Sequence, residues 1–149
     1  MEYRHRLAEL AARQGRPSRI AMVGAGQMGR GFALQATAMS GIAIAVIAAR
    51  TEASIDRAYA DLGLTDAVIS NDVAELNNAI AAGRPAGTTN AVLVGQLDVD
   101  LVVEATGVPE VGAQVVSAAL RGRKHVAVLN VAMDVTIGPM LTKLADDHG

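Results

Sequence analysis

The chain alternates short apolar runs with longer segments in which apolar residues recur at helical spacing. Runs of four to eight apolar residues bounded by turn residues are typical of β-strands, and the longer periodic segments are typical of amphipathic helices. The expected strands are residues 19–23, 42–49, 100–104 and 125–130, with Thr88 and Thr89 as a short edge strand. The expected helices are residues 2–14, 30–40, 51–62, 71–82, 109–121 and 138–147, while 90–97 is either a short helix or a loop.

The alternation of strands and helices predicts an α/β fold with a doubly wound parallel sheet and helices on both faces. The run 42–49 consists of β-branched residues and alanine throughout, which favours a strand that is buried on both faces. Thr51 is expected to cap the helix that follows, and Ser70 or Asn71 to cap the helix 71–82. Because residues 15–18 interrupt the first helix, we expect a helical leader, 1–18, ahead of one domain, 19–149.

The composition argues against several classes of protein. Hydrophobic residues make up 51% of the 149 residues, yet only three are aromatic, so the core must consist of aliphatic side chains and methionine. A net charge of −2 without a basic stripe gives little support to nucleic-acid binding. The absence of cysteine excludes disulfides and thiol catalysis, and three scattered histidines do not predict a metal site. The most apolar stretch, 41–49, is too short to span a bilayer, so we expect a cytoplasmic protein without a membrane partner.

A glycine-rich motif follows the first predicted strand. Gly24, Gly26 and Gly29 fit the spacing G-x-G-x-x-G, and a helix and a second strand are predicted directly beyond them. In Rossmann-type dinucleotide-binding domains the first glycine permits a tight turn, the second lets the backbone approach a diphosphate, and the third lets the helix pack on the strand. The motif therefore predicts a diphosphate at this helix N-terminus. The alternative is a glycine-rich turn that binds something else, or nothing.

The end of the second strand bears on the choice of cofactor. NAD-specific domains place a carboxylate there, where it binds the ribose 2′-hydroxyl. This chain instead has Arg50 followed by Thr51, and Glu52 falls at the start of the next helix. A guanidinium can bind a 2′-phosphate, so the sequence favours NADP(H), with NAD(H) as the other cofactor it could accept. In the alternative interpretation, Arg50 is a solvated residue at a strand end.

Two later strand ends carry further candidates, because ligands of parallel sheets lie beyond the carboxyl ends of the strands. Thr106 and Gly107 are expected near the nicotinamide and its ribose, although Thr106 could equally be a helix cap. Asn130 is placed to meet the nicotinamide edge or a substrate. Glu104 is expected to be structural and to accept backbone N–H groups. No catalytic residues are assigned, since neither a Ser-His-Asp arrangement nor a pair of carboxylates is visible.

The segments GAGQMG, VVEATGVPEVG and LNVAMDVTIGP carry a resemblance to a known family. Together they resemble the N-terminal cofactor domain of homoserine-dehydrogenase-like oxidoreductases with a C-terminal SAF domain, and within these the 1-deoxy-D-xylulose 5-phosphate reductoisomerase-like (DXR-like, DRL) group. By this resemblance three groups of residues hold the cofactor: Gly24, Ala25, Gly26, Gln27, Met28 and Gly29 at the diphosphate; Ala49, Arg50 and Thr51 at the adenosine 2′-phosphate; Thr106, Gly107 and Asn130 near the nicotinamide.

The resemblance also sets expectations for the whole protein. Enzymes of this group are longer, so it implies a cofactor domain truncated before a C-terminal substrate domain. Hydride transfer to a small hydroxy or keto substrate would then need the missing part, and this chain alone would be inactive. Homoserine dehydrogenases usually have lysine after the strand-end asparagine, whereas Val131 stands here, which argues against homoserine as substrate. The alternative is a non-catalytic nucleotide- or CoA-binding module, a redox sensor or a scaffold. Homo-oligomerisation, through the surface that the missing domain would cover or through helix 2–14, is a further expectation.

Overall fold

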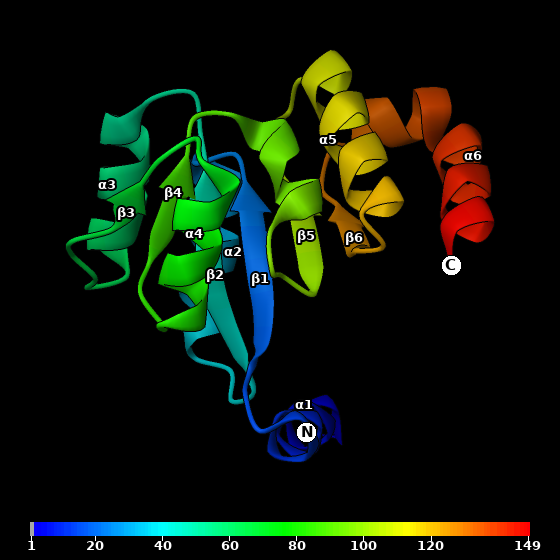
Figure 1. Ribbon diagram of the computed structural model, residues 1–149. Helices are drawn as coiled ribbons and strands as arrows, with labels where there is room; N and C mark the ends of the chain where they lie inside the picture. Colours follow the sequence, from blue (N-terminus) through cyan, green and yellow to red (C-terminus); the bar gives the residue numbers. More distant parts are fainter. Residues whose placement is uncertain (1) are drawn as a thin grey trace.

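A six-stranded sheet between two layers of helices forms the body of the molecule (Figure 1). The computed structural model describes residues 2–149. Its elements, in chain order, are α1 (Glu2–Gln14), β1 (Ser18–Val23), α2 (Gln27–Thr37), β2 (Ile42–Ala48), α3 (Glu52–Asp61), β3 (Val68–Ile69), α4 (Val73–Ala81), β4 (Ala86–Thr88), the 3₁₀ helix η1 (Ala91–Gln96), β5 (Leu101–Glu104), α5 (Pro109–Arg121), β6 (His125–Val128) and α6 (Val131–His148).

The described strands are all parallel and lie in the order β3-β4-β2-β1-β5-β6. The order reverses at β1, which pairs with β2 on one side and with β5 on the other. Ligands of open parallel sheets bind beyond the carboxyl ends of the strands at such a reversal. The predicted α/β class and doubly wound parallel sheet are confirmed, and the ends of β1, β2 and β5 mark the place to look for a site.

Alternate side chains of the strands face two separate apolar layers. Ala21 and Val23 of β1 pack with α4, η1 and α5 on one face, whereas Met22 packs with α2 and α3 on the other. This period of two is the ordinary consequence of β geometry, and it requires helices on both faces. Tyr59 of α3 is buried among aliphatic side chains and donates its hydroxyl to a carbonyl of β4 at 2.7 Å. Burial raises the pKa of the Tyr59 hydroxyl.

The first and last helices lie outside this sandwich. α1 contacts the amino ends of β1 and β2, and α6 packs against α5 beyond the β6 edge of the sheet (Figure 1). The segment after α1 is tied to the start of β5, because Arg16 forms two hydrogen bonds with the Asp100 carboxylate at 2.7 and 3.0 Å. The Arg16 hydrogen bond holds the pKa of the Asp100 carboxyl below its ordinary value, although partial burial opposes the shift.

Two helices, α2 and α6, differ most in extent from the sequence prediction. α2 begins at Gln27 rather than Arg30, because the chain turns into the helix directly after Gly26, and it ends at Thr37 rather than Ser40. α6 begins at Val131 rather than residue 138, since the Asn130 side chain caps it and Pro139 lies inside the helix instead of at its first turn. Figure 1 shows α6 bent, as expected where proline interrupts the hydrogen-bond ladder. As a consequence β6 ends at Val128 and not at residue 130.

The sheet edge also differs from the prediction. The threonine pair was expected to form an edge strand, but β4 is Ala86–Thr88 and lies inside the sheet, with the unpredicted two-residue strand β3 at the edge. Asp72, rather than Ser70 or Asn71, caps α4 by accepting from the Glu75 N–H at 2.9 Å. The first four residues of β2 are only half-buried, because β4 pairs with β2 only from Val46 onward.

Candidate functional site

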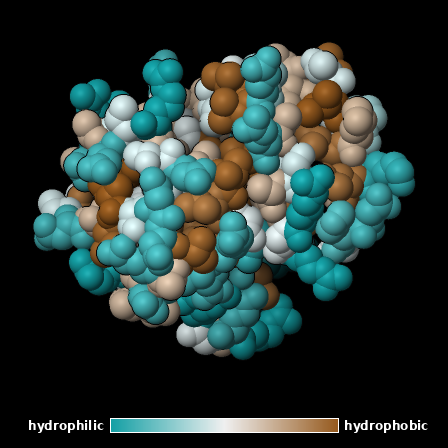
Figure 2. Space-filling model, turned by 45° about the horizontal axis from the view of Figure 1, so that its top comes forward, coloured by the Kyte–Doolittle hydropathy of each residue, from teal (hydrophilic) through white to brown (hydrophobic). Residues whose placement is uncertain are grey.

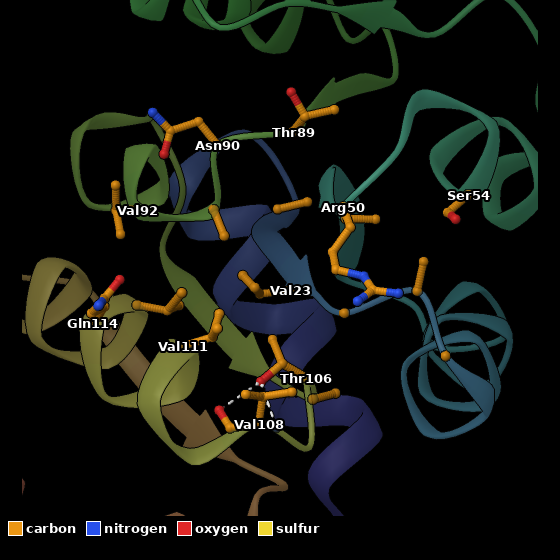
Figure 3. A pocket seen from close by; sticks show the side chains of 18 residues that line it. Val23, Arg50, Ser54, Thr89, Asn90, Val92, Thr106, Val108, Val111 and Gln114 are labelled. Atoms are coloured by element: carbon orange, nitrogen blue, oxygen red, sulfur yellow. Dashed lines mark hydrogen bonds between the residues drawn. The ribbon is translucent and has the colours of Figure 1, made fainter.

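A cavity of about 690 Å³ lies beyond the carboxyl ends of the central strands. Volumes of roughly 300–1,000 Å³ are usual for sites that hold small molecules and cofactors. Figure 3 shows Arg50 and Ser54 at one end, Val111 and Gln114 at the other, and Val23 and Thr106 between them. The lining residues come from the connections after β1, β2, β4 and β5 and from the helices beyond them: Val23, Gly24, Ala25, Gly26, Ala48, Ala49, Arg50, Ser54, Thr89, Asn90, Ala91, Val92, Ala105, Thr106, Val108, Val111, Gln114 and Val115.

The glycine turn forms the middle of the cavity wall. Gly24 has a φ of +104°, a conformation that side chains rarely adopt, and a Cβ there would lie 2.5 Å from the Ala105 carbonyl oxygen. Gly29 does not have a positive φ. A Cβ at Gly29 would, however, lie 1.9 Å from the Gly24 carbonyl oxygen, so only glycine lets α2 pack on β1. Gly26 is different: in the described chain nothing lies within 4 Å of a Cβ built there. The space above Gly26 opens into the cavity.

Helix α2 begins directly after Gly26, which lines the cavity. Gly26 is the N-cap and offers no side-chain acceptor, and the first N–H to bond back along the helix is that of Arg30, to the Gly26 carbonyl at 3.0 Å. The three preceding N–H groups have no carbonyl one turn earlier to accept from them. By contrast α3, α4 and α6 each have a side-chain cap. The first turn of α2 contains no acidic residue, so an anion would meet the positive end of the helix dipole.

Arg50 marks one end of the cavity. Its side chain is exposed, and of the described residues that line the cavity it is the only one with a charge. Thr51 is the predicted cap of α3, and its hydroxyl accepts from the Ser54 N–H at 3.2 Å. Thr51 itself does not line the cavity, whereas Ser54 does. A guanidinium beside a hydroxyl suits a phosphate group.

Thr106 belongs to the other half of the cavity. Its N–H donates to Oε1 of Glu104 at 2.8 Å, and its hydroxyl donates to the same oxygen while accepting from the Val108 N–H at 3.2 Å. Glu104 is fully buried, so the expected structural role as acceptor of a backbone N–H is confirmed. Thr106 is not a helix cap, because α5 begins with Val108 as its N-cap and Pro109 in its first turn.

The predicted binding residues separate into two groups. Half of the twelve line the cavity: Gly24, Ala25, Gly26, Ala49, Arg50 and Thr106. The other six lie beside or behind it: Gln27, Met28, Gly29, Thr51, Gly107 and Asn130. Asn130 is 3% exposed, and its Oδ1 accepts from the Met133 N–H at 3.2 Å as the cap of α6. The binding roles of both groups stay predictions.

Sequence reasoning missed the rim formed after β4. Thr89 and Asn90 line the cavity on the side away from Thr106 (Figure 3). Asn71 holds this rim, because its Oδ1 accepts from the Thr88 hydroxyl at 2.6 Å and from the Thr89 N–H at 3.2 Å. The sequence signal for this rim was the segment TTN, which follows a short and weakly apolar strand. Recognising this segment as part of the site required knowing that β4 lies next to β2.

Apolar side chains surround much of the opening. Val92, Val108 and Val111 line the cavity and are still 37%, 48% and 39% exposed. Figure 2 turns this end of the molecule toward the viewer and shows apolar side chains among polar ones on that face. Such a lining suits the ring faces of a ligand that also carries charge. In the part of the chain that the structure describes, no helix is long and apolar enough to cross a membrane, and no cluster of potential metal ligands occurs.

Comparison with known proteins identifies the fold. No protein-family model matches the chain, and no curated protein matches its sequence. Among solved structures, scyllo-inositol dehydrogenase from Lactobacillus casei with bound NAD(H) and scyllo-inositol is similar with a TM-score of 0.62 at 18% identity, over 89% of this chain and 34% of that one. A mutant 3-ketoreductase from Actinomadura kijaniata in complex with TDP-benzene and NADP is similar with a TM-score of 0.62 at 23% identity, over 89% and 36%.

A third solved structure is a homoserine dehydrogenase from Thiobacillus denitrificans, with a TM-score of 0.57 at 22% identity, over 90% of this chain and 28% of that one. The chain thus spans about a third of the length of the structures it matches. At these identities the likeness bears on the fold alone. The chain has the Rossmann-type α/β fold, a doubly wound parallel sheet with helices on both faces.

Proposed function

We propose that this chain is the nicotinamide-dinucleotide-binding domain of an oxidoreductase. The observation that carries the proposal is the empty volume above Gly26, next to an α2 N-terminus without a side-chain cap. That volume would be filled by any other residue, and the N–H groups beside it match the oxygens of a diphosphate. A bound nicotinamide supplies hydride chemistry, and this domain would hold and orient it.

The strand order supports a direction for the dinucleotide. Because β2, β1 and β5 are neighbours, Arg50, Gly26 and Thr106 follow one another across the cavity. With the diphosphate at Gly26, the adenosine would lie toward Arg50 and the nicotinamide toward Thr106. Ala49 would border the adenosine side. Gln27, Met28 and Gly29 would contribute through their backbone, since no side chain of these three lines the cavity.

We further propose a preference for NADP(H) over NAD(H), supported by the single charge in the lining, that of Arg50. Arg50→Ala should weaken NADPH binding about 10- to 100-fold, the value of a charge-assisted hydrogen bond of roughly 1.5–3 kcal/mol. NADH binding should change less than about threefold, because NADH lacks the 2′-phosphate. Arg57→Ala is the matched control, since Arg57 is an exposed arginine of α3 outside the cavity lining. Equal losses of both cofactors in Arg50→Ala would contradict the preference.

A further proposal concerns the whole enzyme of which this chain would be one domain. We propose a parent of the homoserine-dehydrogenase-like or DXR-like type, as the motifs around Gly24, Thr106 and Asn130 suggest, acting on a small hydroxy or keto substrate. Turnover would require a second, substrate-binding domain, and the solved neighbours are about three times as long as this chain. The competing proposal is a non-catalytic CoA- or nucleotide-binding module, which the exposed apolar rim of the cavity also suits.

Calorimetric titration of the chain with NADPH, NADH and CoA tests these proposals together. Micromolar binding of NADPH, weaker binding of NADH and no binding of CoA is the expected result. CoA binding without dinucleotide binding would support the competing module. Failure of all three ligands to bind would refute the proposed function.

A further inference from the structure

A second cavity, of about 510 Å³, lies at the opposite end of the sheet, where the strands begin. Its lining includes residues 42–45 of β2 and residues 83–85 ahead of β4. No residue lines both this cavity and the one beyond the carboxyl ends of the strands. Figure 1 shows the amino ends of β1 and β2 at the lower end of the molecule, near α1. A ligand in the second cavity would therefore be independent of the proposed cofactor.

The second cavity occupies a gap in the sheet. β2 begins at Ile42, but its neighbour β4 pairs with it only from Val46 onward. On that side no strand of the described chain runs along the first part of β2, and residues 42–45 all line the cavity. An open strand edge presents N–H and C=O groups that can pair with another extended chain. The first part of β2 is such an edge, although the rest of β2 lies inside the sheet.

Apolar side chains border the gap on both faces of the sheet. Leu62, at the end of α3, packs with the apolar layer beside α2 and α3, whereas Ile80 of α4 belongs to the layer on the other face, and both line the cavity. Side chains of an extended segment alternate between the two faces of a sheet. A short strand in the gap would therefore pair with β2 through its backbone and send its side chains in turn toward the two layers.

The charge of the lining is one-sided. Arg16, Arg19 and Arg84 line the cavity, and no described carboxylate does. Arg16 and Arg19 are paired with Asp100 and Asp98, whereas Arg84 is exposed and its side chain has no partner in the described chain. The last turns of α2, α3 and α4 also reach the cavity, but backbone N–H groups cap each of them, which weakens the negative ends of the helix dipoles. The lining therefore favours an acidic partner over a basic one.

We propose that this gap binds an extended peptide segment of another protein, which adds a short strand beside residues 42–45 of β2. In this mode of recognition main-chain hydrogen bonds give affinity, and pockets for alternate side chains give specificity. The matching segment has apolar residues at successive positions, because both faces of the gap are apolar, and acidic residues at the end that meets Arg84. The arginines exclude basic segments from the open edge by repulsion.

NMR titration of the ¹⁵N-labelled wild-type chain with two capped hexapeptides, EEVIVA and AVIVEE, tests this proposal. The two orders place the acidic pair at either end, so both strand directions are covered. At least one peptide should shift the amide signals of residues 42–45 and of residues 83 and 84, and should slow hydrogen exchange along the first part of β2. KKVIVA and AVIVKK should bind at least about fivefold more weakly than their acidic counterparts, since an exposed ion pair is replaced by a repulsion of similar size.

Two variants with matched controls separate the charge from the apolar walls. Arg84→Ala should weaken binding of the acidic peptide about two- to fivefold, and Arg57→Ala, on an exposed residue of α3 outside both cavities, should leave it unchanged. Leu64→Asp should weaken it at least about tenfold, because Leu64 lines the cavity. Leu34→Asp is the control, since Leu34 is an exposed leucine of α2 that lines neither cavity.

Octanoate serves as a probe for a small apolar anion in the same gap. If octanoate shifts the amides of residues 42–45 and the peptides do not, the gap is a small-molecule site and the peptide proposal is overturned. Equal binding of acidic and basic peptides, or no shift along the first part of β2 with either acidic peptide, would also overturn it. Should a variant fail to fold, as its NMR spectrum would show, the comparison of acidic with basic peptides on the wild-type chain decides the matter.

Discussion

Gly26→Ala separates the effect of a substitution on ligand binding from its effect on folding. Gly26 has φ −78° and ψ −171°, an extended conformation open to every residue, and no heavy atom of the described chain lies within 4 Å of the added Cβ. The methyl group therefore projects into the cavity without disturbing the protein. Replacing glycine at an N-cap by alanine should cost at most about 1 kcal/mol of folding stability.

The expected loss of binding is much larger than this. The methyl group occupies the volume through which a diphosphate approaches the first turn of α2. Losing two charge-assisted hydrogen bonds at roughly 1.5–3 kcal/mol each removes about 3 kcal/mol or more, which is at least a 100-fold weaker dissociation constant for NADPH. The large effect on binding and the small effect on folding have separate physical causes, so they can be measured independently.

Isothermal titration with NADPH measures the dissociation constant, and urea denaturation of the same samples measures the folding stability. Gly31→Ala is the matched control, because Gly31 lies in α2, its added Cβ also meets nothing within 4 Å in the described chain, and it does not line the cavity. That variant should gain about 0.5–1 kcal/mol of stability and bind NADPH as wild type does. Binding of NADPH to Gly26→Ala within threefold of wild type would refute the diphosphate site.

Three further changes test the packing and electrostatics of the fold. Gly29→Ala should lose at least about 2 kcal/mol in urea denaturation, because its Cβ would lie 1.9 Å from the Gly24 carbonyl oxygen, and an unchanged midpoint would contradict that contact. Tyr59→Phe should lose about 1 kcal/mol with its buried 2.7 Å hydrogen bond to β4, which the same assay measures. Arg16 lowers the pKa of the Asp100 carboxyl in the folded state. The ion pair therefore stabilises the fold fully at pH values above the unfolded-state pKa of about 3.9. This stabilisation is lost as the pH falls through the lower folded-state pKa. Asp100→Asn should therefore be less stable at pH 7 and show a flatter acid limb in urea titrations at pH 2–6.

The sequence was sufficient for features that depend on neighbouring residues in the chain. The apolar runs predicted β1, β2, β5 and β6, and the spacing of the three glycines located the turn that forms the cavity wall. Arg50 was found because it directly follows an apolar strand. Short or interrupted patterns failed: β3 has only two residues, and Pro139 concealed the first two turns of α6.

Features that depend on strand order could not be predicted. Asn71 shapes the cavity rim only because β4 lies between β3 and β2, an arrangement that no local pattern specifies. The same holds for the burial of Glu104 and Asn130, which come from different strand ends and both lie close to Gly112 of α5, the helix between them in sequence. The sequence placed both residues at strand ends, but it did not predict that both would be buried close to the same helix.

A crystal structure of the chain in complex with NADPH tests the central claim most directly. The account predicts diphosphate oxygens within about 3 Å of the backbone N–H groups of the first turn of α2, directly above Gly26, with the 2′-phosphate at Arg50. A nucleotide bound elsewhere on the molecule, with the volume above Gly26 left empty, would contradict it.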